Sequence, residues 1–381
     1  NAIVLVMGVV GIANLAFMLF FHFCYDPFTR FSRDLYIFLT EKLNGFNKSQ
    51  KRDKTSILIF NWRDTKHIWA GGAEVYLHEL AKRWVVAGHS VTLFCGNDGH
   101  DPRNENVDGV KIIRRGGLFT VYIWAFLYYV LKFRGRFDVI IDSENGLPFF
   151  TPIFTRLPVF LLIHHVHQDL FRSNLYFPMD KIAMFLEGVL MPLVYRNSKI
   201  ITVSESSKKD IMSLGFFKPA NITVVNPGID PALFYTSPKT KYPSFVYLGR
   251  IRAQKNIDVA IRAFAEVVKI YPKSRLYIAG WGDKLDQLTQ LAQSLKLSKS
   301  VKFLGKVSDK GKVKLLGRSW AMLQPSSFEG WGITVIEANA CGTPVIASDV
   351  PGLRDSVLHD ESGILVPAKN EFALAEMMKL L

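Results

Sequence analysis

Residues 321–348, AMLQPSSFEGWGITVIEANACGTPVIAS, contain the pattern that decides the fold. The β-rich run 321–325 leads into a loop with two glycines, a helical stretch follows, and a second β-rich run covers 344–348. Glycines ahead of a helix let backbone N–H groups come close to a ligand, and the N-terminus of a helix favours negative charge. We therefore expect this loop to hold a diphosphate group.

Two acidic side chains, Glu329 and Glu337, bracket the end of that loop. Phosphates would repel a carboxylate beside them, so these acids are expected to contact hydroxyl groups, which a sugar or a ribose provides. A loop acid and an acid on a solvated helix face would show the same E-x7-E spacing. The strand, glycine loop and helix around the two acids favour the sugar-nucleotide interpretation.

The same alternation of β-rich and helical segments extends over most of the chain. In the first half, helical patterns cover 72–87, 180–196 and 206–214. The β-rich runs form two series, 56–61, 91–96, 138–143, 158–164, 199–204 and 221–226, then 244–249, 275–280, 301–305, 321–325, 344–348 and 363–367. This alternation implies parallel sheets with helices on both faces.

A segment with Ser, Pro and Lys, 236–243, separates the two series and is interpreted as a linker. We predict an α/β fold of two Rossmann-like, doubly wound domains, 56–235 and 244–381. Ligands of such folds bind at the carboxyl ends of the strands and in the cleft between domains. The length of 381 residues suits two domains of ordinary size.

Composition narrows the class of protein. Hydrophobic residues make up 49% and charged residues 21% of the chain, which excludes a disordered protein. The three cysteines are far apart and show no C-x-x-C spacing, which argues against a disulfide framework or a cysteine-based zinc site and favours a reducing compartment. The net charge of +14 is compatible with nucleic acid, an anionic membrane surface or a phosphorylated substrate.

The first segment of the chain predicts a membrane anchor. Residues 1–25 contain no Asp, Glu, Lys or Arg, and a helix of this length reaches about 38 Å, enough to cross a hydrocarbon core of about 30 Å. Basic residues exceed acidic ones in the following linker, 26–55, so the positive-inside rule places the rest of the chain in the cytoplasm. We expect a single-pass protein of the cell membrane; a cleaved signal peptide is the alternative.

A second apolar stretch, 118–131, is too short to span a bilayer. Its aromatic residues suit a helix at a membrane interface, and they suit a buried helix of the domain equally well. The sequence leaves both interpretations open.

The stretch 324–348 resembles the E-x7-E region of retaining, family-4-type glycosyltransferases of the GT-B fold, which use nucleotide-sugar donors. The resemblance covers roughly 56–381. It implies that Glu329 contacts hydroxyls of the donor sugar and that Glu337 binds the ribose. It also implies that the backbone around Gly332, Ile333 and Thr334 holds the diphosphate.

The segment 248–256, LGRIRAQKN, matches a second region of that family. Arg250 and Lys255 lie at a strand end, where two fixed cations can neutralise a departing diphosphate. The family does this without a metal, so we expect neither a metal nor a cofactor. Two solvated surface cations are the alternative interpretation.

The segment 69–74, WAGGAE, follows the first strand, and the paired glycines Gly71 and Gly72 before a helix suit close approach to a phosphate or the donor sugar. The resemblance places this loop opposite the donor, across the cleft. A simple tight turn would also explain the two glycines. The segment 279–283, AGWGD, follows a later strand, and the resemblance places Gly280 and Trp281 near the nucleotide base.

The segment 161–169, LLIHHVHQD, ends a strand with histidines. The family usually has a histidine here, near donor sugar and acceptor, and His164 matches it most directly, with His165 as the second choice. His165, His167 and Asp169 also have the residue types of a metal site, but no further His or Cys cluster supports one.

These observations predict a membrane-anchored glycosyltransferase that moves a hexosyl or N-acetylhexosaminyl group from a nucleotide-diphosphate sugar to a lipid-linked or glycan acceptor, with retention. No nucleic-acid partner is expected. A non-catalytic GT-B scaffold subunit of a membrane glycosylation complex is the alternative. GT-B chains usually end in helices that cross back to the N-terminal domain, and this sequence stops at Leu381 before them, as a truncated sequence would.

Overall fold

The computed structural model describes residues 54–381, which form two compact units. The first comprises the described residues through Thr202 together with Lys208–Val225, and the second comprises Val203–Ser207 and Asn226–Leu381. The predicted anchor, 1–25, and nearly all of the predicted linker, 26–55, lie outside the described residues. No helix within 54–381 is long and apolar enough to cross a membrane.

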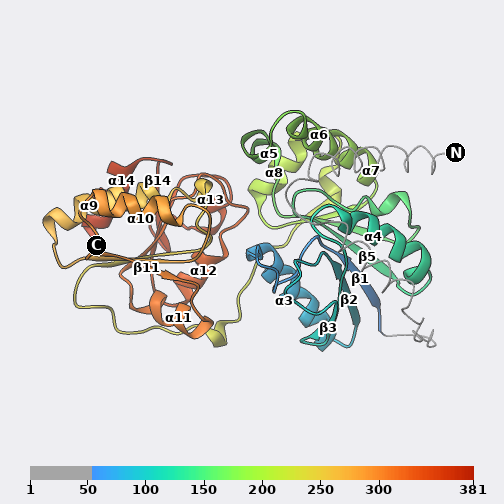
Figure 1. Cartoon of the computed structure of the whole chain (residues 1–381), viewed down its shortest axis with the longest axis horizontal. Coiled ribbons are helices and arrows are strands. Elements are labelled where there is room, and N and C mark those ends of the chain that lie inside the picture. The colour runs from blue at the N-terminus through green and yellow to red at the C-terminus, as the bar shows by residue number, and fades with distance from the viewer. Residues whose placement is uncertain (1–53) are drawn as a thin grey trace. The chain divides into compact units, whose positions relative to one another are not determined.

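The first unit contains an eight-stranded sheet in the order β3-β4-β2-β1-β5-β6-β7-β8 (Figure 1). All neighbouring strands are parallel except β3 and β4. The strands are β1 Ser56–Phe60, β2 Ser90–Cys95, β3 Asn104–Val107, β4 Val110–Arg114, β5 Val139–Glu144, β6 Val159–Ile163, β7 Lys199–Thr202 and β8 Ile222–Val224.

The antiparallel hairpin of β3 and β4 is the part of this sheet that the sequence prediction missed. Asp108 and Gly109 form its turn, with φ angles of 51° and 82°. An Asp-Gly pair tolerates positive φ at both central positions, which is what a tight hairpin turn requires. That dipeptide was the available signal, but the flanking strand β3 is mostly polar and so showed no hydrophobic run.

Residues 118–131 form a helix of the core, which decides between the two interpretations left open above. Helix α4, Thr120–Tyr128, continues into the π-helical turn η1, Tyr129–Phe133. Val121, Trp124 and Tyr128 are fully buried against β1 and β2, where Tyr128 packs on Phe94 with ring centroids 5.1 Å apart. The aromatic residues of this stretch therefore serve the core of the first unit.

The other helices of the first unit are α3 Gly72–Val86, α5 Gln168–Asn174, α6 Met179–Phe185, η3 Leu186–Leu190, α7 Met191–Tyr195 and α8 Glu205–Ser213. The first residues of α8, through Ser207, belong to the second unit. Short 3-10 turns cover η2 Thr151–Ile153 and η4 Pro219–Asn221 in the first unit, and η5 Pro231–Leu233 lies in the second unit.

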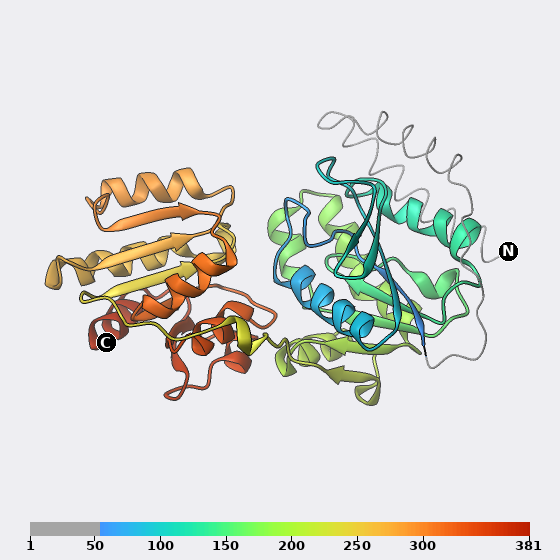
Figure 2. The same cartoon turned by 90° about the horizontal axis from the view of Figure 1, so that it is seen from below.

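The second unit contains a six-stranded parallel sheet in the order β11-β10-β9-β12-β13-β14 (Figure 2). Counted from β9, this is the 3-2-1-4-5-6 order of a doubly wound fold. The strands are β9 Ser244–Leu248, β10 Arg275–Ala279, β11 Val301–Gly305, β12 Ala321–Gln324, β13 Val345–Ser348 and β14 Gly363–Val366.

Helices cover both faces of this sheet, and each face has its own apolar cluster. Helices α9 Ile257–Ile270, α10 Leu285–Ser294 and α14 Glu371–Leu380 pack on one face, and α11 Asp309–Arg318, α12 Ile333–Ala340 and α13 Leu353–Ser356 pack on the other. Phe264 and Leu374 represent the first cluster, Leu316 and Val335 the second. Burial on both faces explains why the strands are nearly continuous apolar runs.

Each sheet has a point where the strand order reverses, between β1 and β5 in the first unit and between β9 and β12 in the second. The loops after these neighbouring strands leave the same edge of the sheet in opposite directions. Ligands of open α/β sheets bind at such points. The loops that follow β1, β5, β9 and β12 are therefore where functional side chains should gather.

Candidate functional site

Lys255 and Glu329 meet at the reversal point of the second sheet. Lys255 ends the short turn η6, Ala253–Lys255, after β9, and Glu329 lies in the loop after β12. Nζ of Lys255 lies 2.5 Å from Oε1 of Glu329, and each side chain is largely covered. The contact forms because β9 and β12 are adjacent and parallel, so both loops leave the same edge. Two residues that the sequence predicted for one site are thus in contact.

Two further side chains hold the same carboxylate oxygen. Nε2 of Gln324 donates to Oε1 of Glu329 at 2.6 Å, and Oγ of Ser326 donates to it at 2.8 Å. Both donors are buried. Three donors on one oxygen fix the carboxylate in position. A carboxylate that contacts particular hydroxyl groups needs to be fixed in this way. The sequence prediction did not include Gln324 and Ser326, although Gln324 is the last residue of the buried strand β12 and Ser326 lies two positions beyond it.

Asn256 ties the two loops to each other. Its Nδ2 donates to the carbonyl of Pro325 at 2.9 Å and to Oγ of Ser327 at 2.6 Å. The backbone N–H of Ser327 donates to the carbonyl of Gln254 at 2.9 Å. Asn256 has a φ of 46°, a left-handed conformation that asparagine tolerates better than most residues. The loops that carry Lys255 and Glu329 therefore form one connected piece.

Gly332 precedes helix α12 with a φ of 89°. A Cβ at this position would lie 2.9 Å from Cδ2 of Leu353, so space and backbone both favour glycine here. Ile333 and Thr334 are the first two residues of the helix. The first amides of a helix have no acceptor within it, and they carry the positive end of the helix dipole. The three residues thus have the geometry expected of an anion-binding turn.

Glu337, on α12, pairs with a cation that the sequence prediction missed. Nζ of Lys312, on α11, lies 2.6 Å from Oε1 of Glu337. Burial raises the pKa of Glu337, and the charge of Lys312 opposes that rise. Glu329 and Glu337 thus have different cationic partners.

Gly280 is required by the packing of two loops. A Cβ at Gly280 would lie 1.8 Å from the carbonyl oxygen of Gly249, and one at Gly282 would lie 1.9 Å from that of Ile251. The loops after β9 and β10 therefore touch backbone to backbone. Trp281 lies between these glycines and is 39% exposed, with Nζ of Lys306 over its ring at 5.4 Å from the centroid.

Arg250 occupies the turn that follows Gly249. Its carbonyl oxygen accepts a hydrogen bond from Oη of Tyr247 at 2.8 Å, and its side chain is partly exposed. The tyrosine belongs to β9 and is otherwise buried. The backbone of Arg250 is thus fixed to the sheet edge from which Lys255 also projects.

In the first unit, Glu74 holds the glycine loop in place. Its Oε2 accepts the backbone N–H of Gly71 at 2.7 Å, and its Oε1 accepts Nε of Arg63 at 2.6 Å and Nδ2 of Asn145 at 2.5 Å. The side chain of Glu74 is fully buried. Because Gly71 precedes α3 and Gly72 begins it, Glu74 acts as the acidic half of a helix N-terminal cap.

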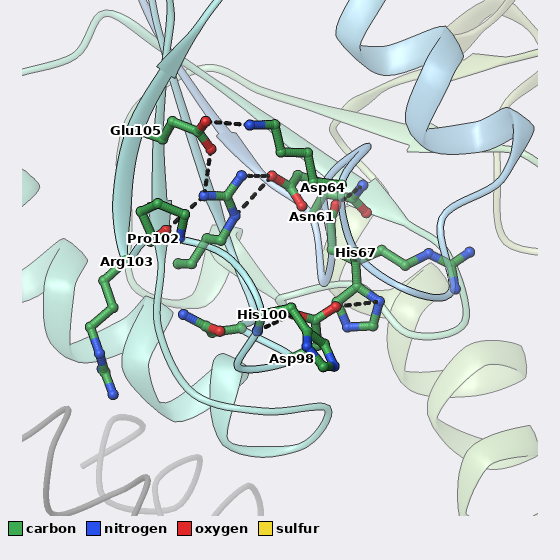
Figure 3. Close-up of polar contacts among 12 residues, drawn as sticks. Asn61, Asp64, His67, Asp98, His100, Pro102, Arg103 and Glu105 are labelled. Atoms are coloured by element: carbon green, nitrogen blue, oxygen red, sulfur yellow. Dashed lines mark hydrogen bonds and ion pairs between the residues drawn. The ribbon is translucent and has the colours of Figure 1, made fainter. Parts of the chain in front are cut away.

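A buried network of charged side chains fixes the segment between β1 and α3 (Figure 3). Asp64 accepts a hydrogen bond from Nε of Arg114 at 2.9 Å, and both side chains are almost fully buried. The same guanidinium lies 2.9 Å from Glu105, on β3. Asp98 accepts the backbone N–H of Ile68 at 2.8 Å. The segment that leads from β1 to the glycine loop is thus anchored at two places, by the ion pair of Asp64 and by the hydrogen bond of Ile68.

His164 directly follows β6 and is 6% exposed. Its ring packs edge-on against that of Tyr76, with centroids 5.7 Å apart. Burial, with smaller effects from the charges of His167 and Arg63, lowers the pKa of His164 to about 3. The imidazole is therefore neutral at physiological pH, so its chemistry is that of a neutral hydrogen-bonding group.

His167 lies between two buried carboxylates. Its Nδ1 is 3.1 Å from Oε1 of Glu144 and 3.3 Å from Oε1 of Glu187. Burial alone would lower the pKa of His167, but the two carboxylates outweigh it and raise the pKa to about 10. Nε2 of Gln168 also donates to Glu187 at 2.7 Å.

Glu144, His167 and Glu187 each offer one ligand atom, and these atoms lie within 4.8 Å of one another, close enough to hold a metal ion. A protonated His167 accounts for the same contacts without one, because its positive charge attracts both carboxylates. Of the three residues considered for a metal in the sequence, only His167 joins this cluster; His165 and Asp169 do not.

The family assignment follows from comparison with known proteins. Residues 70–233 match the family described as Glycosyltransferase Family 4, and residues 233–381 match the family described as Glycosyl transferases group 1. The chain belongs to these glycosyltransferases. The predicted glycosyltransferase family is therefore confirmed, and the two Rossmann-type sheets of a GT-B-like fold are confirmed by the sheet order and by solved structures of the same fold.

An uncharacterised glycosyltransferase of Methanocaldococcus jannaschii is 27% identical to this glycosyltransferase over 347 residues, which cover 84% of this chain and 87% of the relative. Sucrose-phosphate synthase from Thermosynechococcus elongatus has the same fold, with a TM-score of 0.72 and 21% identity over 86% of this chain and 89% of that one. Anabaena HepE, solved in complex with UDP-glucose, gives a TM-score of 0.67 with 19% identity over 86% and 89% of the two chains.

The candidate site residues predicted from the sequence fall into two groups by unit. Lys255, Glu329 and the loops around them share the edge of the second sheet, with Gly332, Glu337 and Trp281 on loops and helices of the same unit. Gly71, Gly72 and His164 belong to the first unit.

Proposed function

We propose that this glycosyltransferase moves a hexosyl or N-acetylhexosaminyl group from a nucleotide-diphosphate sugar to a lipid-linked or glycan acceptor, with retention of configuration. The observation that carries the proposal is the contact between Lys255 and Glu329, held by Gln324 and Ser326. A cation for the diphosphate and a carboxylate for the sugar hydroxyls lie side by side at the reversal point of a doubly wound sheet. The complex of Anabaena HepE with UDP-glucose supports a nucleotide-sugar donor.

The second unit would bind the donor. The backbone amides of Gly332, Ile333 and Thr334, at the N-terminus of α12, favour a negatively charged ligand and would hold the diphosphate. Glu329 would accept hydrogen bonds from the sugar hydroxyls. Glu337 would do the same for the ribose.

The base would lie by Gly280 and Trp281. Trp281 exposes part of its ring, on which a base can stack.

The transfer step breaks the bond between the sugar's anomeric carbon and the diphosphate oxygen, and the electron pair stays on that oxygen. Arg250 and Lys255 would stabilise the charge that develops there. The acceptor oxygen forms the new bond on the face that the diphosphate leaves, and its proton passes to the departing phosphate. His164 would bind sugar or acceptor as a neutral group, because its pKa of about 3 excludes an imidazolium at neutral pH.

Residues 1–25 and the basic segment after them support a single-pass anchor with the catalytic units in the cytoplasm, and hence a lipid-linked acceptor. Transfer to detergent-solubilised polyprenyl-linked glycans in preference to soluble glycans would support this acceptor class. The opposite preference would favour a polysaccharide acceptor.

A panel of nucleotide sugars offered to the purified full chain tests the transfer itself. We expect Lys255→Ala and Glu329→Ala to lower turnover by orders of magnitude while the protein stays folded. Lys269→Ala is the matched control, since Lys269 is an exposed lysine paired with Glu266 on α9 of the same unit. Wild-type turnover in Lys255→Ala would overturn the assignment. Donor binding without turnover in the wild-type chain would favour the scaffold alternative.

A further inference from the structure

The continuous helix formed by α6, η3 and α7 has an unusual period. A row of buried positions recurs every four residues, at Met179, Ala183, Glu187, Met191 and Tyr195, with Asp180 and Pro192 buried beside it. Its exposed positions also recur every four residues, at Lys181, Phe185, Val189 and Leu193. An ordinary α-helix, with about 3.6 residues per turn, would rotate such positions steadily away from one face. The wider π-helical turn η3 compensates for this drift, so the helix keeps two opposite faces.

Apart from Lys181, the exposed row is apolar, and the turn before α6 adds two exposed aromatic side chains. Phe185, Val189 and Leu193 are 55%, 37% and 47% exposed. Tyr176 and Phe177, in the preceding turn, are 84% and 80% exposed, the highest values for aromatic side chains among the described residues. We call these five residues the aromatic face. Clustered exposed apolar residues mark interaction sites more often than single ones do.

The exposed charged residues of the chain segment that carries the aromatic face are mainly basic. Across residues 168–199 the exposed charged side chains are those of Arg172, Lys181, Arg196 and Lys199 and one acid, Asp169. The two other acids of this segment, Asp180 and Glu187, are buried. Oδ2 of Asp180 lies 3.5 Å from Nζ of Lys181, whose side chain is still 60% exposed. An anionic lipid bilayer has negatively charged headgroups above an apolar interior. Exposed aromatic rings next to basic side chains complement both layers.

We propose that the aromatic face docks on the surface of an anionic lipid bilayer. The rings of Tyr176, Phe177 and Phe185 would enter the boundary between headgroups and acyl chains, and the four basic side chains would contact the lipid phosphates. This docking goes beyond the proposed function, because it depends neither on transfer activity nor on whether residues 1–25 span the membrane. Segment 1–53 of this chain and a second copy of the protein are the other possible occupants.

Site-specific fluorescence tests the docking on the full chain. A Cys24→Ser background leaves Cys95 and Cys341, which are both buried. Phe185→Cys then carries an environment-sensitive NBD label on the aromatic face. Phe372→Cys is the matched control, since Phe372 is 71% exposed on α14 of the second unit. Both labelled proteins are reconstituted in vesicles of phosphatidylcholine with or without phosphatidylglycerol.

We expect the label at 185 to brighten several-fold in phosphatidylglycerol vesicles and to be quenched by spin-labelled lipid, and the label at 372 to do neither. High salt and the double change Lys181→Glu, Arg196→Glu should reduce the response. A label at 185 that stays dark and unquenched overturns the proposal. If the label at 185 is shielded in detergent but spin-labelled lipid does not quench it, segment 1–53 covers the aromatic face. If the shielding of the label rises with protein concentration, a second copy of the protein covers it. Either result also overturns the proposal.

Discussion

One carboxylate oxygen of Glu187 accepts the backbone N–H of His167 at 2.5 Å and lies 3.3 Å from Nδ1 of the same residue. Glu187 sits on the π-helical turn η3, and His167 lies in the loop after β6, three positions beyond His164. A helical turn 20 residues farther along the chain thus holds both the backbone and the side chain of His167. This makes Glu187 a positioning residue for that loop.

Removal of His167 should destabilise the first unit strongly. His167→Gln leaves the buried carboxylates of Glu144 and Glu187 without their cation, and breaking a buried ion pair in this way costs about 3–5 kcal/mol. Chemical denaturation of the variant measures the loss. Asp169→Asn, two positions along on the exposed side, is the control and should change the free energy of unfolding by less than about 0.5 kcal/mol. Equal stability of the two variants would show that the cluster is not charged.

The pH dependence of stability should carry the signature of His167. Its pKa in the folded protein, about 10, is above the ordinary value of 6.5. The stabilisation is therefore complete below about pH 6.5 and is lost as pH rises through about 10. The difference in unfolding free energy between wild type and His167→Gln should shrink steadily from pH 7 to pH 10. A difference that stays constant over this range would mean that His167 is neutral in the folded protein.

The donors that hold Glu329 should matter for the chemical step. Ser326→Ala removes a buried hydrogen bond to a carboxylate, and such bonds contribute about 1.5–3 kcal/mol. We expect kcat to fall at least tenfold with the donor KM little changed, since Glu329 loses orientation but keeps Lys255. Steady-state kinetics with the preferred donor measures both constants. Ser294→Ala, an exposed serine on α10, should behave as wild type. An unchanged kcat in Ser326→Ala would show that Glu329 needs no such support.

Gly280→Ala should destabilise the second unit. The new Cβ would lie 1.8 Å from the carbonyl oxygen of Gly249, so the two loop backbones must separate. Overpacking of this kind costs about 1–3 kcal/mol. A lower denaturation midpoint is the expected readout. Gly228→Ala is the control, because a Cβ there meets nothing within 4 Å. A Gly280→Ala protein as stable as this control would contradict the close approach.

Metal chelation should leave the transfer rate unchanged. Arg250 and Lys255 would supply the positive charge that a metal supplies elsewhere, and His167 fills the space between Glu144 and Glu187 as a cation. Assays with and without EDTA check the first statement. Thermal midpoints with added zinc or manganese check the second and should not move. A rate lost with EDTA and restored by a divalent cation would show that the reaction requires a metal.

The sequence predicted the parallel strands well, because buried strands are short apolar runs between turn residues. Through the family resemblance it also predicted that Lys255 and Glu329 belong to one site, and the structure supplies the physical reason, because both follow strands whose carboxyl ends share an edge. The pairing of Glu337 with Lys312 was out of reach, because nothing local indicates which face of α11 meets α12. The ambiguity of 118–131 had a similar cause: apolar aromatics look alike whether a core or a membrane surrounds them.

The two hydrogen bonds from Asn256 to the neighbouring loop have a consequence for engineering this enzyme. Suppose that residues 325–332 alone are exchanged for those of a relative in order to change donor specificity. Asn256 would then face a different loop, and both of its hydrogen bonds would be lost. Recombination should therefore transfer 253–256 and 325–332 as one cassette, and natural variation at these two stretches is expected to be coupled.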